Sequence, residues 1–163
     1  MSRIKSTSVA RPFFVPRIRG LRESALWLAG GLATILFVAL ASYDPGDPAF
    51  SVSGDTQTVT NRMGPAGAWF ADVAYLLFGG PAYLFPVLVM LGGYLFFRGR
   101  ERPASAKTVA WRGAGFALTL LASCGLATLH FAAPQLRETA GGVIGQLVGG
   151  GFAYVLSPLG ATV

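Results

Sequence analysis

The sequence predicts an all-α membrane protein with three transmembrane helices and two further interfacial or reentrant helices at the outer face. Three observations support this fold class. Only 12% of the 163 residues are charged and 53% are hydrophobic, whereas about a quarter of the residues in an ordinary soluble domain are charged. Three uncharged stretches each reach the roughly 20 residues that a helix needs to cross a bilayer. The basic residues gather in two segments beside these stretches.

The chain divides into seven predicted segments that alternate between membrane and water. They run in this order: a basic cytoplasmic tail at 1–23, a first transmembrane helix at 24–43, a periplasmic loop at 44–65, an interfacial helix and second transmembrane helix at 66–97, a basic cytoplasmic loop at 98–112, a third transmembrane helix at 113–134, and a periplasmic glycine-rich interfacial segment with the start of a fourth helix at 135–163.

The distribution of charge predicts the orientation of these segments. Eleven of the 13 basic residues lie in the tail and in the 98–112 loop, and the other two loops hold Arg62 and Arg137 alone. Short loops rich in Lys and Arg stay in the cytoplasm, so we expect a cytoplasmic N-terminus in a bacterial inner (plasma) membrane. The arginines that flank the spans and decide this topology are Arg17, Arg19, Arg22, Arg98, Arg100, Arg102 and Arg112.

The same distribution bears on two alternatives. A net charge of +6 invites a nucleic-acid interpretation, but the basic residues lie where the topology requires them and no aromatic-interleaved patch accompanies them. We therefore expect contact with the lipid bilayer and no direct contact with nucleic acid. The small residues of 38–41 resemble a signal-peptidase site, yet the preceding apolar run exceeds the 7–15 residues of a typical signal peptide.

The predicted outer loop begins with residues that favour turns. Tyr43 ends the first span, Asp44, Pro45, Asp47 and Pro48 follow it, and each proline pushes the preceding residue away from helical geometry. We interpret this run as a rigid turn at the membrane exit with an aromatic residue at headgroup depth. A metal site formed by the two aspartates is the alternative, but no His or third acid lies nearby.

The segment from Gly64 to Phe97 is too long for one crossing, and Gly79-Gly80-Pro81 should interrupt a helix. We therefore expect a short helix at 66–78 on the outer face and a crossing at 81–97. Its acid Asp72 is predicted to face water or to cap a neighbouring helix; a proton relay would need a second titratable group, and the spans offer only His130. The structural candidates here are Gly64, Gly67, Trp69, Asp72, Gly79 and Pro81.

A weak internal repeat links the two outer segments. Gly64-x-x-Gly67 followed by an aromatic–aliphatic run is echoed by Gly142-x-x-Gly145, which Gly141 precedes. If the repeat holds, a fourth span should begin near Ser157, so the chain is expected to be truncated before or within that span.

Together these features resemble the N-terminal membrane domain of the FtsK/SpoIIIE family of bacterial DNA translocases. The matching runs, in family order, are 42–48, 64–72, Phe78-Gly79 with Ala82-Tyr83, 123–127 and 140–145. The resemblance implies a four-span membrane anchor concentrated at the division septum, divisome proteins as partners, and self-association as a hexamer through a motor domain that lies outside this sequence.

No catalytic, cofactor-binding or metal-binding residues are predicted. The sequence has no Gly-x-x-x-x-Gly-Lys-Ser/Thr loop, so ATP hydrolysis by that route is excluded, and Cys124 is the single cysteine. The alternative function is a small transporter or channel subunit, or a membrane scaffold unrelated to DNA. A transporter or channel would need polar residues at mid-membrane. The three spans contain essentially none.

Overall fold

The computed structural model describes residues 15–52, 58–98, 105–131 and 139–160, and within these ranges every regular element is a helix. The all-α class is therefore confirmed. The elements, in chain order, are α1 (Val15–Ala41), α2 (Gly64–Phe78), the 3-10 helix η1 (Gly80–Tyr83), α3 (Leu84–Arg98), α4 (Ala106–His130) and α5 (Gly142–Gly160).

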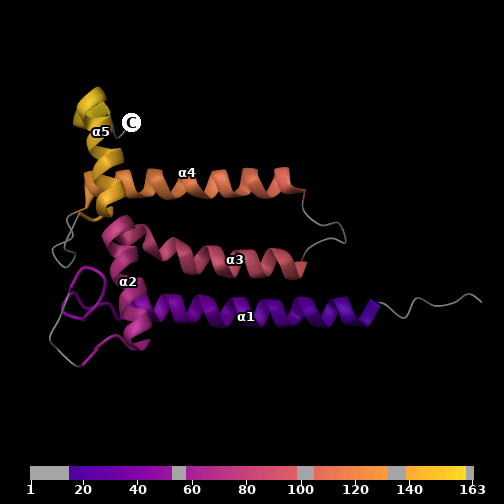
Figure 1. Cartoon of the computed structure of the whole chain (residues 1–163). Coiled ribbons are helices and arrows are strands. Elements are labelled where there is room, and N and C mark those ends of the chain that lie inside the picture. The colour runs from indigo at the N-terminus through magenta and orange to yellow at the C-terminus, as the bar shows by residue number, and fades with distance from the viewer. Residues whose placement is uncertain (1–14, 53–57, 99–104, 132–138, 161–163) are drawn as a thin grey trace, which may run out of the picture.

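Three helices, α1, α3 and α4, run side by side, and two others, α2 and α5, lie across one end of them (Figure 1). We call α1, α3 and α4 the long helices, because the segments Gly20–Ala41, Gly80–Arg98 (η1 with α3) and Ala106–His130 are long and apolar enough to cross a membrane. The cross helices α2 and α5 lie at the end where α1 and α4 finish (Figure 1). We call this the cap end, and the opposite end, where α3 finishes and α4 begins, the basic end.

The long helices are packed unevenly. Along their length α1 and α3 contact one another, and Gly93 allows α3 to approach the Ala29 side chain of α1 closely. In contrast, α4 packs mainly against η1 and α5 and touches α3 through the Phe85–Phe116 ring pair. Residues 105–115, in the half of α4 near the basic end, are exposed on all sides. Among the three, α4 is therefore joined to the rest of the protein mainly at the cap end.

The buried core also lies at the cap end. Leu40, Ala71, Ala74 and Ala82 form one cluster drawn from α1, α2 and η1. Alanine at three of these positions lets the helix backbones approach closely, as is usual where helices pack within a membrane. The aromatic side chains that enclose this cluster are Tyr43, Phe70, Tyr75, Phe78 and Tyr83.

Two helix bounds differ from the expected ones. The third long helix occupies Ala106–His130, whereas the sequence suggested 113–134. It begins earlier because Lys and Arg favour a helix and can extend their charges along it into water; residues 132–138 lie outside the described ranges. Nearer the C-terminus, α5 continues through Ser157-Pro158 to Gly160, across the position near Ser157 where a separate fourth span was expected to begin. A proline so near the helix end removes few backbone hydrogen bonds.

The two cross helices begin in the same way. Gly64 and Gly142 are the first residues of α2 and α5, with φ of 68° and 64°. In each case the glycine N–H donates to a carbonyl three residues earlier, Asn61 or Thr139, at 2.9 Å. A positive φ is readily adopted only by glycine, so the weak sequence repeat corresponds to a repeated turn geometry.

Candidate interaction site at the cap end

The loop between α1 and α2 is attached to α2 by the carboxylate of Asp72. This side chain is 3% exposed. It accepts hydrogen bonds from the Ser51 N–H and hydroxyl, both at 2.7 Å, and from the Tyr43 hydroxyl at 3.3 Å. Asp72 was expected to face water or cap a helix. It is instead enclosed, because the loop folds back over α2 and supplies its donors.

A second buried carboxylate closes the loop on itself. Asp47 is 4% exposed and accepts hydrogen bonds from the Thr60 N–H at 2.7 Å, the Thr60 hydroxyl at 2.8 Å and the Asn61 N–H at 2.9 Å. Burial raises the pKa of Asp47, but these three donors favour its charged form and leave the pKa below the ordinary value of 3.8. The carboxylate therefore stays ionised while buried.

Asn61 joins this loop to the end of α1. Its side-chain amide donates to the Ala39 carbonyl at 2.8 Å and to the Ser42 carbonyl at 3.2 Å, while its own oxygen accepts from the Met63 N–H at 3.0 Å. The last carbonyls of a helix have no partner within the helix, and Asn61 supplies one. Gly67 lies directly against the Asn61 side chain, where a Cβ would collide with it.

The exit turn that follows α1 is shaped by local hydrogen bonds. The Gly46 N–H donates to the Asp44 carboxylate at 2.7 Å, and the Asp47 N–H donates to the Asp44 carbonyl at 3.2 Å, across Pro45. Pro48 follows, half-buried. The carboxylates of Asp44 and Asp47 have different donors, and the described residues contain no group of three His, Cys, Asp or Glu side chains that could hold a metal ion.

The two cross helices meet where α2 ends and α5 begins. The Gly80 N–H donates to the Ala140 carbonyl at 2.8 Å. Gly79, with φ of 60°, lies against the same residue, and a Cβ on Gly142 would come within 2.6 Å of the Leu77 carbonyl. These backbones touch because neither glycine carries a side chain. We call this contact the glycine junction. Pro81 lies in η1, directly after it.

The start of α5 also packs on α4 through glycine. Gly141 and Gly145 both lie against the Cys124 carbonyl and the Thr128 hydroxyl of α4, where a Cβ would collide with these atoms. The Cys124 thiol in turn donates to the Phe78 carbonyl at 3.5 Å. Three helices, α2, α4 and α5, thus meet at one place with small residues between them.

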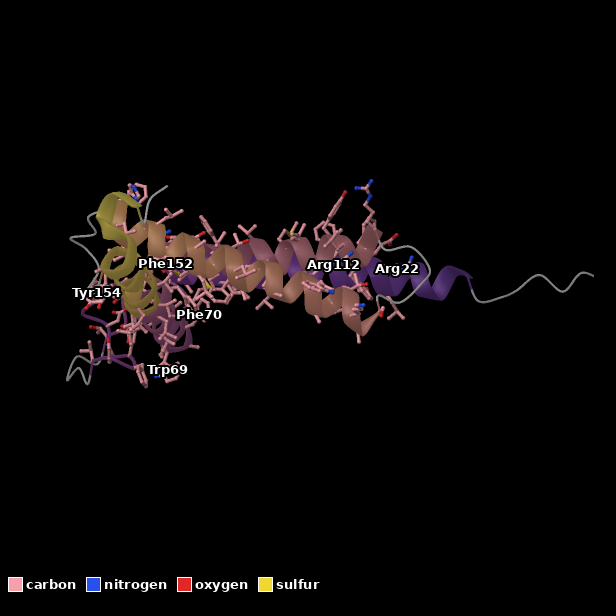
Figure 2. The ribbon with its side chains drawn as sticks, turned by 90° about the horizontal axis from the view of Figure 1, so that it is seen from above. Arg22, Trp69, Phe70, Arg112, Phe152 and Tyr154 are labelled. Carbon is pink, nitrogen blue, oxygen red and sulfur yellow. The ribbon has the colours of Figure 1, made fainter. Side chains whose placement is uncertain are left out.

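Aromatic side chains are exposed along the outside of the cap end. The rings of Phe50 and Trp69 meet edge to face at 5.7 Å, and the two residues are 61% and 54% exposed. On α5, Phe152 and Tyr154 are 55% and 93% exposed. Figure 2 shows Trp69, Phe70, Phe152 and Tyr154 at the end opposite Arg22 and Arg112.

The arginines predicted to determine topology fall at the basic end wherever they are described. Arg22, Arg98 and Arg112 lie there on three different helices, and the Arg98 guanidinium donates to the Tyr94 hydroxyl at 3.3 Å. The backbone of Arg17 and Arg19 belongs to the first turns of α1. The remaining two, Arg100 and Arg102, lie outside the described residues.

The structure thus brings most of the predicted candidates together at the cap end, in the loop contacts and the glycine junction. Sequence reasoning did not find Ser51, Thr60 and Asn61, which supply the donors for the two carboxylates. One signal pointed to Asn61, because it stands three residues before Gly64 as Thr139 stands before Gly142. The other two are common polar loop residues, and no pattern in the chain distinguishes them.

The fold and the cap end define a class of protein, a polytopic α-helical membrane domain. Among the described residues, the buried polar groups hold the helices and the loop together, and they do not form a recognisable catalytic arrangement. Its sequence matches the model of one family, described as the 4TM region of DNA translocase FtsK/SpoIIIE, over residues 18–163. The chain belongs to this family.

Curated relatives carry the same name, DNA translocase FtsK. The protein from Pseudomonas putida is 36% identical over 166 residues, covering 97% of this chain and 20% of the relative. The Vibrio vulnificus protein is 32% identical over 98% of this chain and 16% of its own length, and the Pseudomonas aeruginosa protein is 36% identical over 87% and 18%. No solved structure matches the chain significantly.

The chain spans about a fifth of the length of the relatives it matches, 20% for the Pseudomonas putida protein. The matched part is their membrane region and not the ATPase motor. This chain is accordingly a membrane domain of that family.

Proposed function

We propose that this chain is the inner-membrane anchor and oligomerisation domain of a septal DNA translocase that links cell division to chromosome segregation. The observation that carries the proposal is the family match over residues 18–163. The anchor holds the translocase at the membrane through the three spans, and divisome proteins and further copies of the chain are its partners.

The proposed orientation puts the basic end in the cytoplasm and the cap end in the periplasm. It is supported by Arg22, Arg98 and Arg112, which three different helices bring to the same end. Reporter fusions after Arg98 should therefore read as cytoplasmic, and insertions after Thr56 as periplasmic. A cytoplasmic signal from the second position would refute this orientation.

A fluorescent fusion to the chain tests the septal role. In dividing cells it should concentrate at the septum, and an even distribution around the envelope would contradict the proposal. Two variants refine the test. Asp72→Ala opens the loop contacts and should weaken septal enrichment, whereas Asp44→Ala removes an exposed carboxylate from the same loop and should leave enrichment unchanged.

Self-association of the chain is tested separately. Native mass spectrometry of the chain in nanodiscs should show assemblies of more than one copy. A single copy at every protein concentration would leave oligomerisation to other parts of the translocase and would remove it from this domain.

A further inference from the structure

The cross helices α2 and α5 form a continuous bar that exposes no charge. α5 contains no charged residue along its 19 positions. α2 contains one, Asp72, which is 3% exposed. On the outside of α2, Ala66 and Trp69 are exposed and Val73 is half-buried, so the outward stripe is apolar. A helix that faces water on one side normally carries charged residues there.

The lengths of three helices give the distance between this bar and the basic end. At about 1.5 Å per residue, α4 rises about 27 Å from Ala106 to Cys124, where α5 crosses it. The crossing that contains α3 also rises about 27 Å between Arg98 and Gly80, where α2 has just ended, and α1 rises about 30 Å from Gly20 to Leu40. The hydrocarbon core of a bilayer is about 30 Å thick. A membrane with one boundary at the basic end would therefore have its other boundary, between hydrocarbon and headgroups, at the bar.

Aromatic side chains are exposed on both parts of the bar. The Phe50–Trp69 pair lies beside α2, while Phe152 and Tyr154 project from α5, as Figure 2 shows. Trp and Tyr are enriched at this depth, because one part of the ring system favours hydrocarbon and the polar group favours hydrated headgroups. The type of exposed residue thus agrees with the depth.

We propose that the bar formed by α2 and α5 is a lipid-binding surface, embedded in the headgroup boundary of the leaflet at the cap end, with the Phe50–Trp69 pair as its main anchor. The inference does not depend on the proposed translocase function, because it needs only the bilayer and this chain. Its consequence is mechanical: a bar that lies in the plane of the interface resists tilting of the spans, which three nearly parallel helices alone would resist less.

The partner is phospholipid rather than protein for a reason visible in the structure. Crossings of about 27–30 Å put the exposed residues of the bar at the depth where lipid headgroups already surround the spans. A second copy of the chain or another membrane protein could cover the same surface, and the experiment below distinguishes these outcomes.

The test uses the tryptophans of the chain, Trp27, Trp69 and Trp111. Replacing Trp27 and Trp111 by Phe leaves Trp69 as the only tryptophan in the full chain, which is reconstituted in nanodiscs and excited where tyrosine does not absorb. Lipids that carry a nitroxide near the headgroup should quench its fluorescence at least about twofold more than lipids that carry the nitroxide near the end of the acyl chain. A soluble quencher, iodide, should have little effect.

A matched control keeps only Trp27, which is 81% exposed and lies about 10 Å along the span from Gly20. It should respond more strongly than Trp69 to the deep nitroxide. A second reporter, Phe152→Trp with the three native tryptophans replaced by Phe, examines α5 and should behave like Trp69.

Two results would overturn the proposal. Strong quenching of Trp69 by iodide, with little effect of either lipid, would place the bar in water. Protection from iodide and from both lipids would mean that protein covers the bar. Circular dichroism of each variant verifies that the helices remain folded, and the proposal holds only if the reporters on α2 and α5 both show shallow quenching by lipid.

Discussion

Replacing Asp72 by Ala should destabilise the cap end more than the removal of any exposed carboxylate. The substitution deletes two short hydrogen bonds from Ser51, both at 2.7 Å, and a longer one from Tyr43 at 3.3 Å. Hydrogen bonds to a charged group contribute about 1.5–3 kcal/mol each. Because part of the loop can turn its donors to water once released, we expect a net loss of about 3 kcal/mol of unfolding free energy.

The assay is thermal unfolding of the chain in nanodiscs, followed by helical circular dichroism. For a chain of this size about 1 kcal/mol shifts Tm by roughly 2–4 °C, so Asp72→Ala should lower Tm by about 6–12 °C. Asp72→Asn keeps one acceptor oxygen and should lose roughly half as much. Hydrogen exchange of the Ser51 amide should accelerate in both variants, since its acceptor is lost or weakened.

Asp44→Ala is the matched control, because it also removes one carboxylate from the cap end. Asp44 is exposed, and its carboxylate accepts a local hydrogen bond from Gly46. Its loss should cost less than about 0.5 kcal/mol. Equal Tm values for Asp72→Ala and Asp44→Ala, with unchanged exchange at Ser51, would refute the role assigned to the Asp72 contacts.

Three further predictions concern the glycines and the second carboxylate. Gly142→Ala should lower the free energy of unfolding by about 2–4 kcal/mol, because alanine would be held at a φ of 64° and pressed against α2. Its control is Gly150→Ala, which lies in open space on the same helix and should be neutral or slightly stabilising. In α3, Gly93→Ala should lower the free energy of unfolding by about 1–3 kcal/mol because its Cβ would push against α1, while a Cβ at Gly92 meets nothing, so Gly92→Ala should not destabilise the protein. Thermal unfolding measures both pairs of variants, and equal Tm values within either pair would contradict the packing described for that glycine. The pKa of Asp47 lies below 3.8 in the folded protein, so its hydrogen bonds should stabilise the fold fully above about pH 5, and this stabilisation should be lost as the pH falls through the folded pKa. The Tm difference between the native chain and Asp47→Asn should therefore shrink over that acid range. A Tm difference that stays constant would contradict a buried, ionised Asp47.

Much of the architecture follows from local sequence, because the bilayer reduces the choices. Inside hydrocarbon the backbone must satisfy its own hydrogen bonds, so an uncharged stretch of sufficient length has to be a helix. The change of direction at Gly79-Gly80-Pro81 was predicted for the same kind of local reason. Gly79 has a φ of 60°, and α2 ends at the residue before it.

The contacts of the cap end could not be predicted in this way. The donors of Asp72 lie 21 and 29 residues away in the chain, and their meeting depends on how a loop with little regular structure folds back. The prediction for Asp72 failed because it considered only what an isolated interfacial helix would offer. Asn61 is different, because its place three residues before Gly64 matches that of Thr139 before Gly142. The sequence repeat therefore indicated that Asn61 has a structural role.

The glycine junction explains how two helix pairs, α1 with α3 and α4 with α5, form one domain although their long helices contact each other little. Between helices in a membrane the hydrophobic effect is weak, and close packing and hydrogen bonds decide which helices associate. α4 is exposed along its half near the basic end, so its position relative to α1 and α3 depends largely on the cap end. There the Gly80–Ala140 hydrogen bond and the approach of Gly142 to the Leu77 carbonyl join the end of α2 to the start of α5. A side chain at Gly142 should therefore move α4 and α5 together relative to the α1–α3 pair and leave the contact between Gly93 and Ala29 intact. Distances between spin labels on α1, α3 and α4 of the Gly142→Ala variant would measure this: the α1–α4 distance should change and the α1–α3 distance should not, whereas equal changes in both would show that the long helices themselves hold the domain together.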